Sequence, residues 1–332
     1  MSSSKTIYDV AALAGVSIST VSLALNSPAR VSAETRRKVL EAVDALGFAP
    51  KPEAVAKARR GVGRIGVIAP YTSYPSVAQR LNGILRFVSH RPLEIVLFDQ
   101  VSAAQSSSPL LASLPITGRL DGLIVISLPL DEVVAKRLTT LRLPTVLIDV
   151  RYPGFDAILT SDSLGGRLVA EHLIAQGHCH FAFLGETQQS SLYVSPAQQR
   201  LIGYRSALQE AGYSLAEDDV RFTLHGVEPA MNMAMELLAQ EKRPTAVFAS
   251  SDTLAAGVLR AARKLGLSVP DEVAIVGFDD GELAEALDLT TVRQPLEETG
   301  RAAMERLLQQ LEKPTTTREV MLNLELVKRA TG

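Results

Sequence analysis

The sequence predicts a small all-α helix-turn-helix head, followed by an α/β core with two doubly wound parallel-sheet subdomains around a cleft. Three helical patterns, each with its own start and stop signals, fill the first 47 of 332 residues. After residue 64, short apolar runs alternate with amphipathic helical patterns, which is typical of parallel sheets covered by helices on both faces. The alternation is too long for one open sheet and therefore indicates two subdomains.

In the head, each helix is expected to begin after a hydroxyl side chain that can cap it. Thr6, Ser17 and Ser32 precede the three patterns, and each can accept a hydrogen bond from a free N–H of the first turn. Gly15 suits the tight turn after the first helix, and Gly47 suits the end of the third. Helix, short turn, helix and supporting helix follow the helix-turn-helix plan.

In that plan the second helix lies in the major groove of DNA with its N-terminal residues at base edges. Its outward residues would be Ile18, Ser19, Ser22 and Leu23. A helical bundle that contacts another protein is the alternative, because this spacing alone is a weak signal.

The core is expected to alternate strands and helices in sequence order. The predicted strands are 65–69, 95–98, 123–126, 145–148, 181–184, 246–249 and 273–276, and the predicted helices lie near 76–89, 131–141, 164–176, 197–211, 229–240 and 253–265.

Polar side chains follow several of these strands, where doubly wound sheets bind their ligands. Asp149, Ser251 and Asp279 each follow a strand, and Arg200 lies at the start of a helix. Ionised carboxylates accept hydrogen bonds from vicinal sugar hydroxyls, and a guanidinium donates to them. A site for a ligand with hydroxyl groups is therefore predicted, although each acid could instead cap a helix or lie on the surface.

The net charge of −2 hides an uneven distribution. Residues 1–64 contain ten Lys or Arg against five Asp or Glu, so this part carries +5 and the remainder carries −7. A basic head can attract nucleic acid, but the same charges could also form an ordinary solvated face.

Several other classes of protein and site are not expected. The single cysteine, Cys179, argues against a disulfide scaffold, and no secretory h-region or membrane span is present, which favours a cytoplasmic protein without membrane association. No catalytic motif is found, so an enzyme is not expected. The glycine pattern at 61–66 precedes a strand and lacks the context of a dinucleotide site.

His178-Cys179-His180 could suggest a metal site, but no second ligand cluster lies at a usual zinc spacing. A structural role is favoured for this segment, and neither a metal nor a cofactor is expected.

A dense, ordered set of short motifs fills the head: Ile7-Tyr8-Asp9-Val10-Ala11, Gly15-Val16-Ser17, Thr20-Val21-Ser22, Leu25-Asn26, Val31-Ser32, Thr35-Arg36 and Ala45-Leu46-Gly47-Phe48-Ala49-Pro50. On these residues the head resembles the DNA-binding domain of the lactose-repressor (LacI-type) family. The resemblance implies DNA contacts from Thr6, Ser17, Ile18, Ser19, Thr20, Ser22, Leu23, Asn26 and Ser32 in the head, and from Ala54 and Lys57 in the linker.

Two departures from the family pattern affect the expected DNA recognition. Relatives commonly have Arg at the position of Leu23, and Leu can offer only an apolar contact, for instance to a thymine methyl. The linker has Lys57 or Arg59 where relatives have a Leu that wedges into the minor groove. The sequence therefore predicts neither the presence nor the absence of a kink at the centre of the operator DNA.

The core resembles the periplasmic sugar-binding-protein-like core of the same family. Matching blocks are Ile65-Gly66-Val67-Ile68, Gly177-His178, Arg200-Leu201-Ile202-Gly203-Tyr204, Ser251-Asp252, Gly277-Phe278-Asp279-Asp280 and Leu289-Thr290-Thr291-Val292-Arg293-Gln294-Pro295. The resemblance adds Ser73 and Gln294 to Asp149, Arg200, Ser251 and Asp279 as effector contacts. The aromatic side chain that often stacks on the ligand could be Tyr71, Tyr193 or His225.

The resemblance implies a division into a head (1–49), a basic linker (50–63) and a core (64–332). Within the core, one subdomain would contain 64–161 and 293–319, and the other 162–292 and 320–332. The expected function is a sequence-specific transcriptional regulator, most simply a repressor, that binds a pseudo-palindromic operator as a homodimer and a carbohydrate-like effector between the subdomains. A sugar-binding receptor without a DNA role is the alternative.

Overall fold

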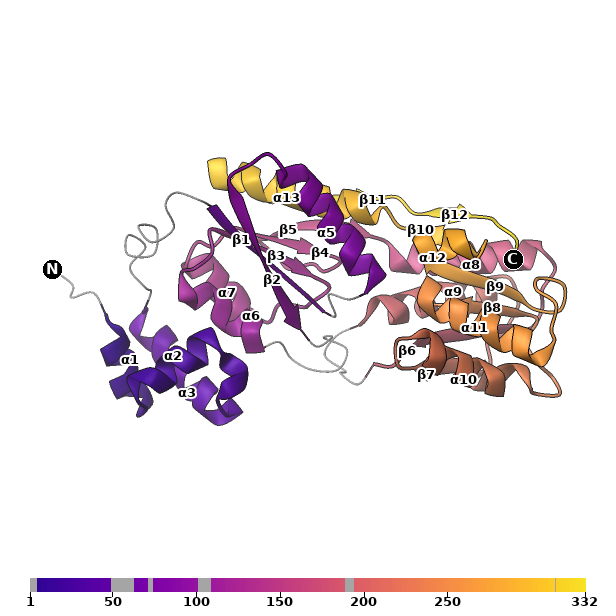
Figure 1. Ribbon diagram of the computed structural model, residues 1–332, viewed down its shortest axis with the longest axis horizontal. Coiled ribbons are helices and arrows are strands. Elements are labelled where there is room, and N and C mark those ends of the chain that lie inside the picture. The colour runs from indigo at the N-terminus through magenta and orange to yellow at the C-terminus, as the bar shows by residue number, and fades with distance from the viewer. Residues whose placement is uncertain (1–4, 49–62, 71–73, 101–108, 189–193, 314) are drawn as a thin grey trace. The chain divides into compact units, whose positions relative to one another are not determined.

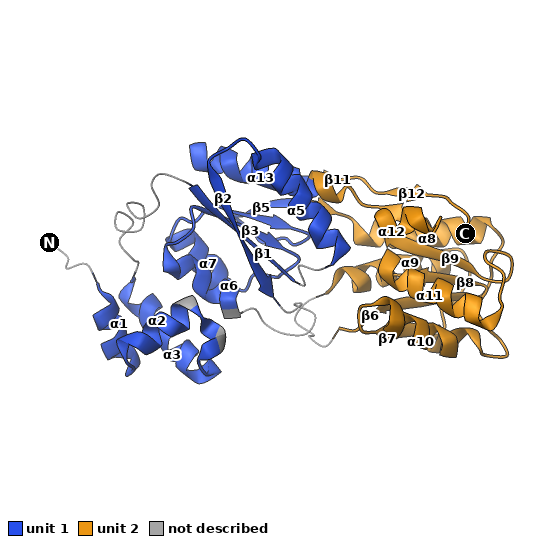
Figure 2. Cartoon of the chain, viewed as in Figure 1, with its two compact units in different colours: residues 1–158, 299–320 blue, residues 159–298, 321–332 orange. Residues whose placement is uncertain are grey.

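The computed structural model describes residues 5–48, 63–70, 74–100, 109–188, 194–313 and 315–332. The chain divides into two compact units, shown in different colours in Figure 2. Unit 1 contains residues 1–158 and 299–320, and unit 2 contains residues 159–298 and 321–332. The chain therefore passes between the units three times.

The head, which belongs to unit 1, contains the three predicted helices (Figure 1). They are α1 (Ile7–Ala14), α2 (Ile18–Asn26) and α3 (Ala33–Leu46), with a short 3-10 turn, η1 (Pro28–Arg30), after α2. Thr6, Ser17 and Ser32 each accept the hydrogen bond expected of an N-cap. Gly15 and Gly47 end α1 and α3 in left-handed backbone, so the predicted start and stop signals are confirmed.

The inward faces of the three helices form a small apolar core around Val10, Val21 and Val39, which are fully buried. Ile116 of the body joins this core, and Arg137 donates to the carboxylate of Asp44 from Nε at 2.8 Å and Nη2 at 2.6 Å. The head is thus packed both on itself and on the body of unit 1.

The body of unit 1 is a six-stranded sheet in the order β11-β5-β4-β3-β1-β2. Figure 1 shows α5 and α13 on one face of the sheet and α6 and α7 on the other. The strands are β1 (Gly63–Pro70), β2 (Leu93–Gln100), β3 (Gly122–Ile126), β4 (Thr145–Ile148), β5 (Asp156–Thr160) and β11 (Glu319–Leu322). The helices are α5 (Pro75–Val88), α6 (Pro109–Ser113), η2 (Leu114–Thr117), α7 (Glu132–Thr140) and α13 (Leu296–Glu312).

Unit 2 contains a second six-stranded sheet in the order β12-β10-β9-β8-β6-β7, in which β12 runs antiparallel to β10. The strands are β6 (Phe181–Glu186), β7 (Val220–Thr223), β8 (Ala246–Ala249), β9 (Ala274–Asp279), β10 (Thr290–Arg293) and β12 (Glu325–Val327). The helices are α8 (Asp162–Ala175), α9 (Pro196–Glu210), η3 (Glu217–Asp219), α10 (Val227–Leu238), α11 (Asp252–Leu265) and α12 (Glu282–Ala286).

The central strands of unit 2 are buried on both faces. Along β6, Phe181 and Phe183 pack against α8 and α9, whereas Ala182 and Leu184 pack with the apolar side chains of α10 and α11. This alternation places helices on both sides of the sheet, and the predicted fold class is therefore confirmed.

Several elements were not predicted. α13 is the largest omission, because Gly300 interrupts its apolar periodicity and Pro295 precedes it. The others are short helices or short strands, several at a sheet edge: α6, α12, β5, β7, β10, β11 and β12. Among the described residues, no single helix is long and apolar enough to cross a membrane; α1 and α2 pass that test only as a pair bent by 100°.

Candidate functional site

Asp149 lies at the carboxyl end of β4, beside the end of the neighbouring parallel strand β3. Its Oδ2 accepts hydrogen bonds from Ser127 Oγ and from Arg80 Nη2, both at 2.7 Å. The side chains of Asp149 and Arg80 are each 5% exposed. Asp149 is therefore neither a helix cap nor a surface charge.

The second carboxylate oxygen of Asp149 is buried and has no hydrogen-bond partner among the described residues. A buried acceptor without a donor costs about 1–3 kcal/mol, so native proteins rarely leave one unmatched. Arg80 Nε is likewise buried and without a hydrogen-bond partner among the described residues, so this strand end leaves one acceptor and one donor unmatched. A hydroxyl group both donates and accepts, so it is the kind of ligand group that would match them once it reached these atoms.

In unit 2, Arg200 lies in the second turn of α9 rather than at its start. Its Nε donates to Asp162 Oδ1 at 2.8 Å, and its Nη1 donates to the carbonyl oxygen of Ser250. The guanidinium carbon lies 3.6 Å from the ring centroid of Phe278, in the geometry of a cation–π contact. These contacts hold the charged group in one place beside the carboxyl ends of β8 and β9.

Two glycines allow α8 and α9 to approach closely enough for this placement. A Cβ on Gly166 would overlap the carbonyl oxygen of Arg200, and a Cβ on Gly203 would overlap that of Ser163. The position of Arg200 therefore depends on the absence of side chains where the two helices touch.

Asp279 ends β9, and Gln294 follows the adjacent strand β10. Gln294 Nε2 donates to Asp279 Oδ1 at 2.7 Å, and Thr160 Oγ1 donates to Gln294 Oε1 at 3.4 Å. The structure thus brings two of the predicted residues together. Ser251 caps α11 by accepting a hydrogen bond from the N–H of Leu254, so a structural role is visible for it.

Asp252 follows Ser251 and was not predicted as a functional residue. It is 4% exposed and accepts hydrogen bonds from Thr291 Oγ1 at 2.6 Å and from Gly281 N at 3.0 Å. Burial and, secondly, the nearby charge of Asp279 raise the pKa of Asp252 to about 7. The polar end of this sheet therefore contains an acid that titrates near neutral pH.

His225 follows β7 and lies beside Glu186 at the end of β6, with 3.8 Å between Nδ1 and Oε2. Burial lowers the pKa of His225 to about 4, so its ring is neutral at pH 7. A neutral ring at a strand end can pack against an apolar ligand face. The other aromatic candidates, Tyr71 and Tyr193, and the predicted contact Ser73 lie outside the described residues.

The N-terminal end of α2 is exposed, as a recognition helix requires. Ser17, Ile18 and Ser19 are exposed, whereas Thr20, Ser22 and Leu23 are half-buried. Thr6 and Ser32 are exposed N-caps of α1 and α3, and helix N-termini favour anions such as phosphate. The side chain of Asn26 and the linker residues Ala54 and Lys57 lie outside the described part of the chain.

The positive charge of residues 1–64 belongs mostly to the linker. Residues 5–48 contain five basic and four acidic residues, so the helical part contributes only +1. On α3, Arg37 pairs with Glu41 and Lys38 pairs with Glu34, each at 2.8 Å. The remaining excess comes from residues 49–64, including Lys51, Lys57, Arg59 and Arg60.

The two histidines of His178-Cys179-His180 have different partners. His178 Nδ1 lies 3.1 Å from Thr245 Oγ1, and His180 Nε2 lies 2.9 Å from Asp219 Oδ2. No group of three potential metal-ligating side chains was found in the described part of the chain. The glycine pattern at 61–66 runs into β1, which begins at Gly63.

The residues that hold the predicted ligand contacts were not predicted from the sequence. Arg80 lies on the inward face of α5 with Val77 and Ile84, and a cation on an apolar helix face was the available signal. Asp162, which holds Arg200, gave no comparable signal because an acid in a first helical turn is common.

Comparisons with known proteins identify the family of the chain. Residues 6–51 match the description "Bacterial regulatory proteins, lacI family", and residues 170–331 match "Periplasmic binding protein-like domain". The chain is 31% identical over 333 residues to the HTH-type transcriptional repressor PurR of Vibrio campbellii, with 98% of each chain covered.

Two solved structures resemble the chain over almost its whole length. A complex of the transcriptional regulator CelR with cellobiose has a TM-score of 0.72 and 29% identity, covering 99% of this chain and 100% of that one. A lac repressor dimer bound to operator and the anti-inducer ONPF has a TM-score of 0.70 and 28% identity, with 99% of both chains covered. The chain therefore belongs to the lacI family of bacterial regulatory proteins, which are DNA-binding transcriptional regulators rather than enzymes.

Proposed function

We propose that this regulator is a cytoplasmic, homodimeric repressor whose affinity for a pseudo-palindromic operator is controlled by a small carbohydrate. The observation that carries the effector half of this proposal is the buried, unpaired oxygen of Asp149 at a strand end. The solved relatives with cellobiose or ONPF support a sugar-like ligand.

We assign candidate effector contacts within each unit separately. Asp149 would accept a ligand hydroxyl in unit 1, and Asp279 and Gln294 would bind others in unit 2. Arg200 would donate to a ligand oxygen, with Ser251 and Ser73 as further contacts. We assign effector binding to residues 64–332, DNA binding to residues 1–49 and phosphate contacts to the linker, residues 50–63.

At the operator, α2 would enter the major groove with Ser17, Ile18 and Ser19 foremost, because their side chains are exposed. Two heads related by a two-fold axis would read two half-sites. The solved lac repressor, which is a dimer bound to operator, supports a dimer on DNA. Leu23 lacks the fork with which Arg reads guanine, so the half-site should differ there from that of relatives with Arg.

The effector can change DNA affinity only if it binds the two states of the protein with different free energies. We therefore expect operator affinity and effector affinity to change by the same factor when both ligands are present. Gel retardation across a sugar titration and calorimetry with and without operator would measure the two factors.

The DNA half is tested by selecting binding sites from a random duplex library. We expect a two-fold symmetric motif, and Ser19→Asp should abolish retardation by placing a carboxylate against the DNA. An acid in a first helical turn favours the helix, so the head should stay folded. Gln209→Glu on α9 is the control, because it adds the same charge to unit 2. If both variants lose binding to the selected DNA motif equally, the assignment of the DNA contact to α2 is contradicted.

The effector half is tested by a thermal-shift screen of monosaccharides, disaccharides, nucleobases and sugar phosphates. For the sugar that stabilises the protein, Asp279→Asn and Arg200→Ala should each weaken binding by about 1–3 kcal/mol, because each strands a polar partner. Asp271→Asn, an exposed acid in unit 2, should leave the affinity unchanged. Sugar binding without DNA retardation would instead indicate the receptor function.

A further inference from the structure

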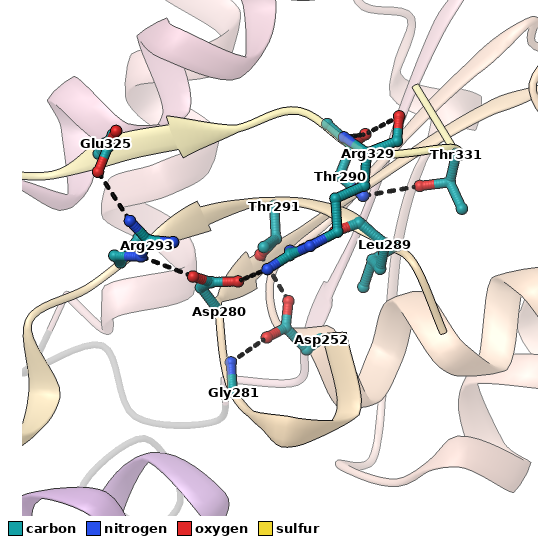
Figure 3. A network of polar contacts seen from close by, with 10 residues as sticks. All are labelled: Asp252, Asp280, Gly281, Leu289, Thr290, Thr291, Arg293, Glu325, Arg329 and Thr331. Carbon is teal, nitrogen blue, oxygen red and sulfur yellow. Dashed lines mark hydrogen bonds and ion pairs between the residues drawn. The ribbon is translucent and has the colours of Figure 1, made fainter. Parts of the chain in front are cut away.

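Asp280, the neighbour of Asp279, connects the end of β9 to two other segments of unit 2 (Figure 3). Its carboxylate accepts from Arg293 Nε at 2.7 Å and from Arg329 Nη2 at 2.6 Å. The Asp280 side chain is 7% exposed, so both ion pairs are shielded from water on that side. Such charge-assisted hydrogen bonds are stronger than neutral ones and resist displacement of the loop.

Arg329 is itself held rigidly. Its Nη1 donates to the carbonyl oxygen of Leu289 at 2.8 Å, and its backbone N–H donates to Thr290 Oγ1 at 2.9 Å. Thr331 fixes the same segment, since its hydroxyl donates to the Ile275 carbonyl at 2.7 Å. The Arg329 side chain is 17% exposed, whereas that of Arg293 is 48% exposed. Arg329 is therefore the better shielded of the two partners of Asp280.

Each residue of the segment 279–281 takes part in at least one hydrogen bond with a side chain from elsewhere in unit 2. Gln294 donates to Asp279, the two arginines hold Asp280, and Asp252 accepts from the N–H of Gly281. Asp279 and Asp280 have φ angles of 124° and 59°, a backbone conformation that L-residues adopt only at a cost. Strain of this kind persists only where the surrounding contacts enforce it.

The two arginines also lie near two of the passages of the chain between units. Arg293 precedes the passage at residues 298–299, and Arg329 follows the passage at residues 320–321. The contacts of Asp280 thus join the end of β9 to one segment that leaves unit 2 and to another that enters it.

We propose that Arg329 is a positioning residue of the effector site, which acts through Asp280 to fix the strained backbone that presents Asp279. The proposal rests on the proposed function for the statement that Asp279 contacts the effector. Without Arg329, Asp280 retains only the half-exposed Arg293 as an ion-pair partner, and the backbone at Asp279 and Asp280 relaxes towards negative φ. Asp279 then turns away from the orientation in which it accepts a ligand hydroxyl.

The experiment compares Arg329→Ala and Arg329→Lys with the parent protein and with Arg260→Ala, which removes an exposed arginine of α11. Hydrogen exchange of peptides that span residues 277–283 measures how readily the backbone of this loop opens. Calorimetry with cellobiose and with ribose measures the affinity of the effector site. Gel retardation of the selected operator without sugar measures the affinity of the head for DNA.

Arg329→Ala should accelerate exchange at 277–283 and raise the sugar Kd, each by at least about tenfold, because a charge-assisted hydrogen bond is lost. Arg329→Lys should be intermediate, since it keeps the cation but loses the fork that joins Asp280 to Leu289. Operator binding without sugar should be unchanged in both variants, and Arg260→Ala should match the parent throughout.

Unchanged exchange at 277–283 in Arg329→Ala overturns the proposal, and so does an increase spread over the whole of unit 2. If Arg329→Ala does not fold, the exchange rate at residues 277–283 in Arg329→Lys tests the proposal in its place. If neither sugar binds the parent protein, the exchange rates alone test whether Arg329 holds this loop. A parent protein that binds neither sugar nor DNA refutes the proposed function without altering the exchange result.

Discussion

Left-handed backbone at non-glycine residues is concentrated at the strand ends of both units. Ser127, Asp149, Asp279 and Asp280 have positive φ angles, and they follow or end β3, β4 and β9. Each such conformation costs about 1–3 kcal/mol. The cost falls mainly on residues assigned to the effector site or on their immediate partners, so the fold fixes these polar groups before any ligand arrives.

The raised pKa of Asp252 makes the stability of the protein depend on pH. Its pKa is about 7 in the fold and 3.8 in the unfolded chain, so the folded state binds the proton more tightly. The resulting stabilisation is complete below pH 3.8 and is lost as pH rises through 7, by about 4 kcal/mol at most. Urea denaturation followed by circular dichroism between pH 4.5 and 8 measures the change.

Asp252→Asn cannot ionise, so the stability of the parent relative to that of the variant should fall as pH rises to 7 and then stay constant. The exposed acid Asp271 provides the control variant Asp271→Asn, whose curve should run parallel to that of the parent. Parallel curves for Asp252→Asn would contradict the assignment.

At the scale of single residues, the sequence could predict the acids but not their partners. Asp149 and Asp279 were identifiable because a polar residue directly after a buried strand lies at the edge where ligands bind. Arg80 is 69 positions from Asp149, and only the packing of α5 against the sheet brings the two together. Asp252 was hidden because its unusual pKa arises from burial and from Asp279, 27 positions away in the sequence.

At the scale of elements, the contact between α8 and α9 should be the most sensitive to small substitutions. Gly203→Ala places a methyl group on the carbonyl of Ser163, so the helices must separate or shift. We expect a loss of about 1–3 kcal/mol of stability, and a weaker effector affinity because Arg200 moves with α9. Thermal denaturation and calorimetry check both effects.

Gln209→Ala on the exposed side of the same helix is the control, because its side chain is exposed. Equal melting temperatures for Gly203→Ala and the parent protein would show that the helices can adjust without cost.

Elements with strong local signals were predictable, and elements defined by their neighbours were not. The caps at Thr6, Ser17 and Ser32 predicted the first residue of each head helix correctly, because capping is a local interaction. In α13, Gly300 weakens the helical pattern but is needed where the helix meets α5, since a Cβ there would overlap the carbonyl of Arg80. The edge strand β11 has exposed residues alternating with half-buried ones and lacks the apolar run of a central strand.

At the scale of the whole molecule, DNA binding should depend on the linker more than on the charge of the helices. Replacing Lys57, Arg59 and Arg60 by Ala should reduce the slope of log affinity against log salt by about 3, at roughly 0.9 per phosphate contact. Arg37→Ala should change it little, because Arg37 pairs with Glu41. Gel retardation at several salt concentrations measures the slopes, and equal slopes would exclude the linker from the phosphate contacts.

The interleaved order of the two units also has a consequence for synthesis. β5 ends the first stretch of unit 1, but its edge partner β11 is translated roughly 160 residues later, which takes roughly 8 to 30 seconds at bacterial-scale rates. During that interval β5 has an unpaired edge, and Asp156 lacks the partners Arg306 and Arg318 that surround it in the finished fold. We therefore expect the unfinished chain to present an unpaired strand edge, at which another chain can add, and an unmatched charge until the final segment is made.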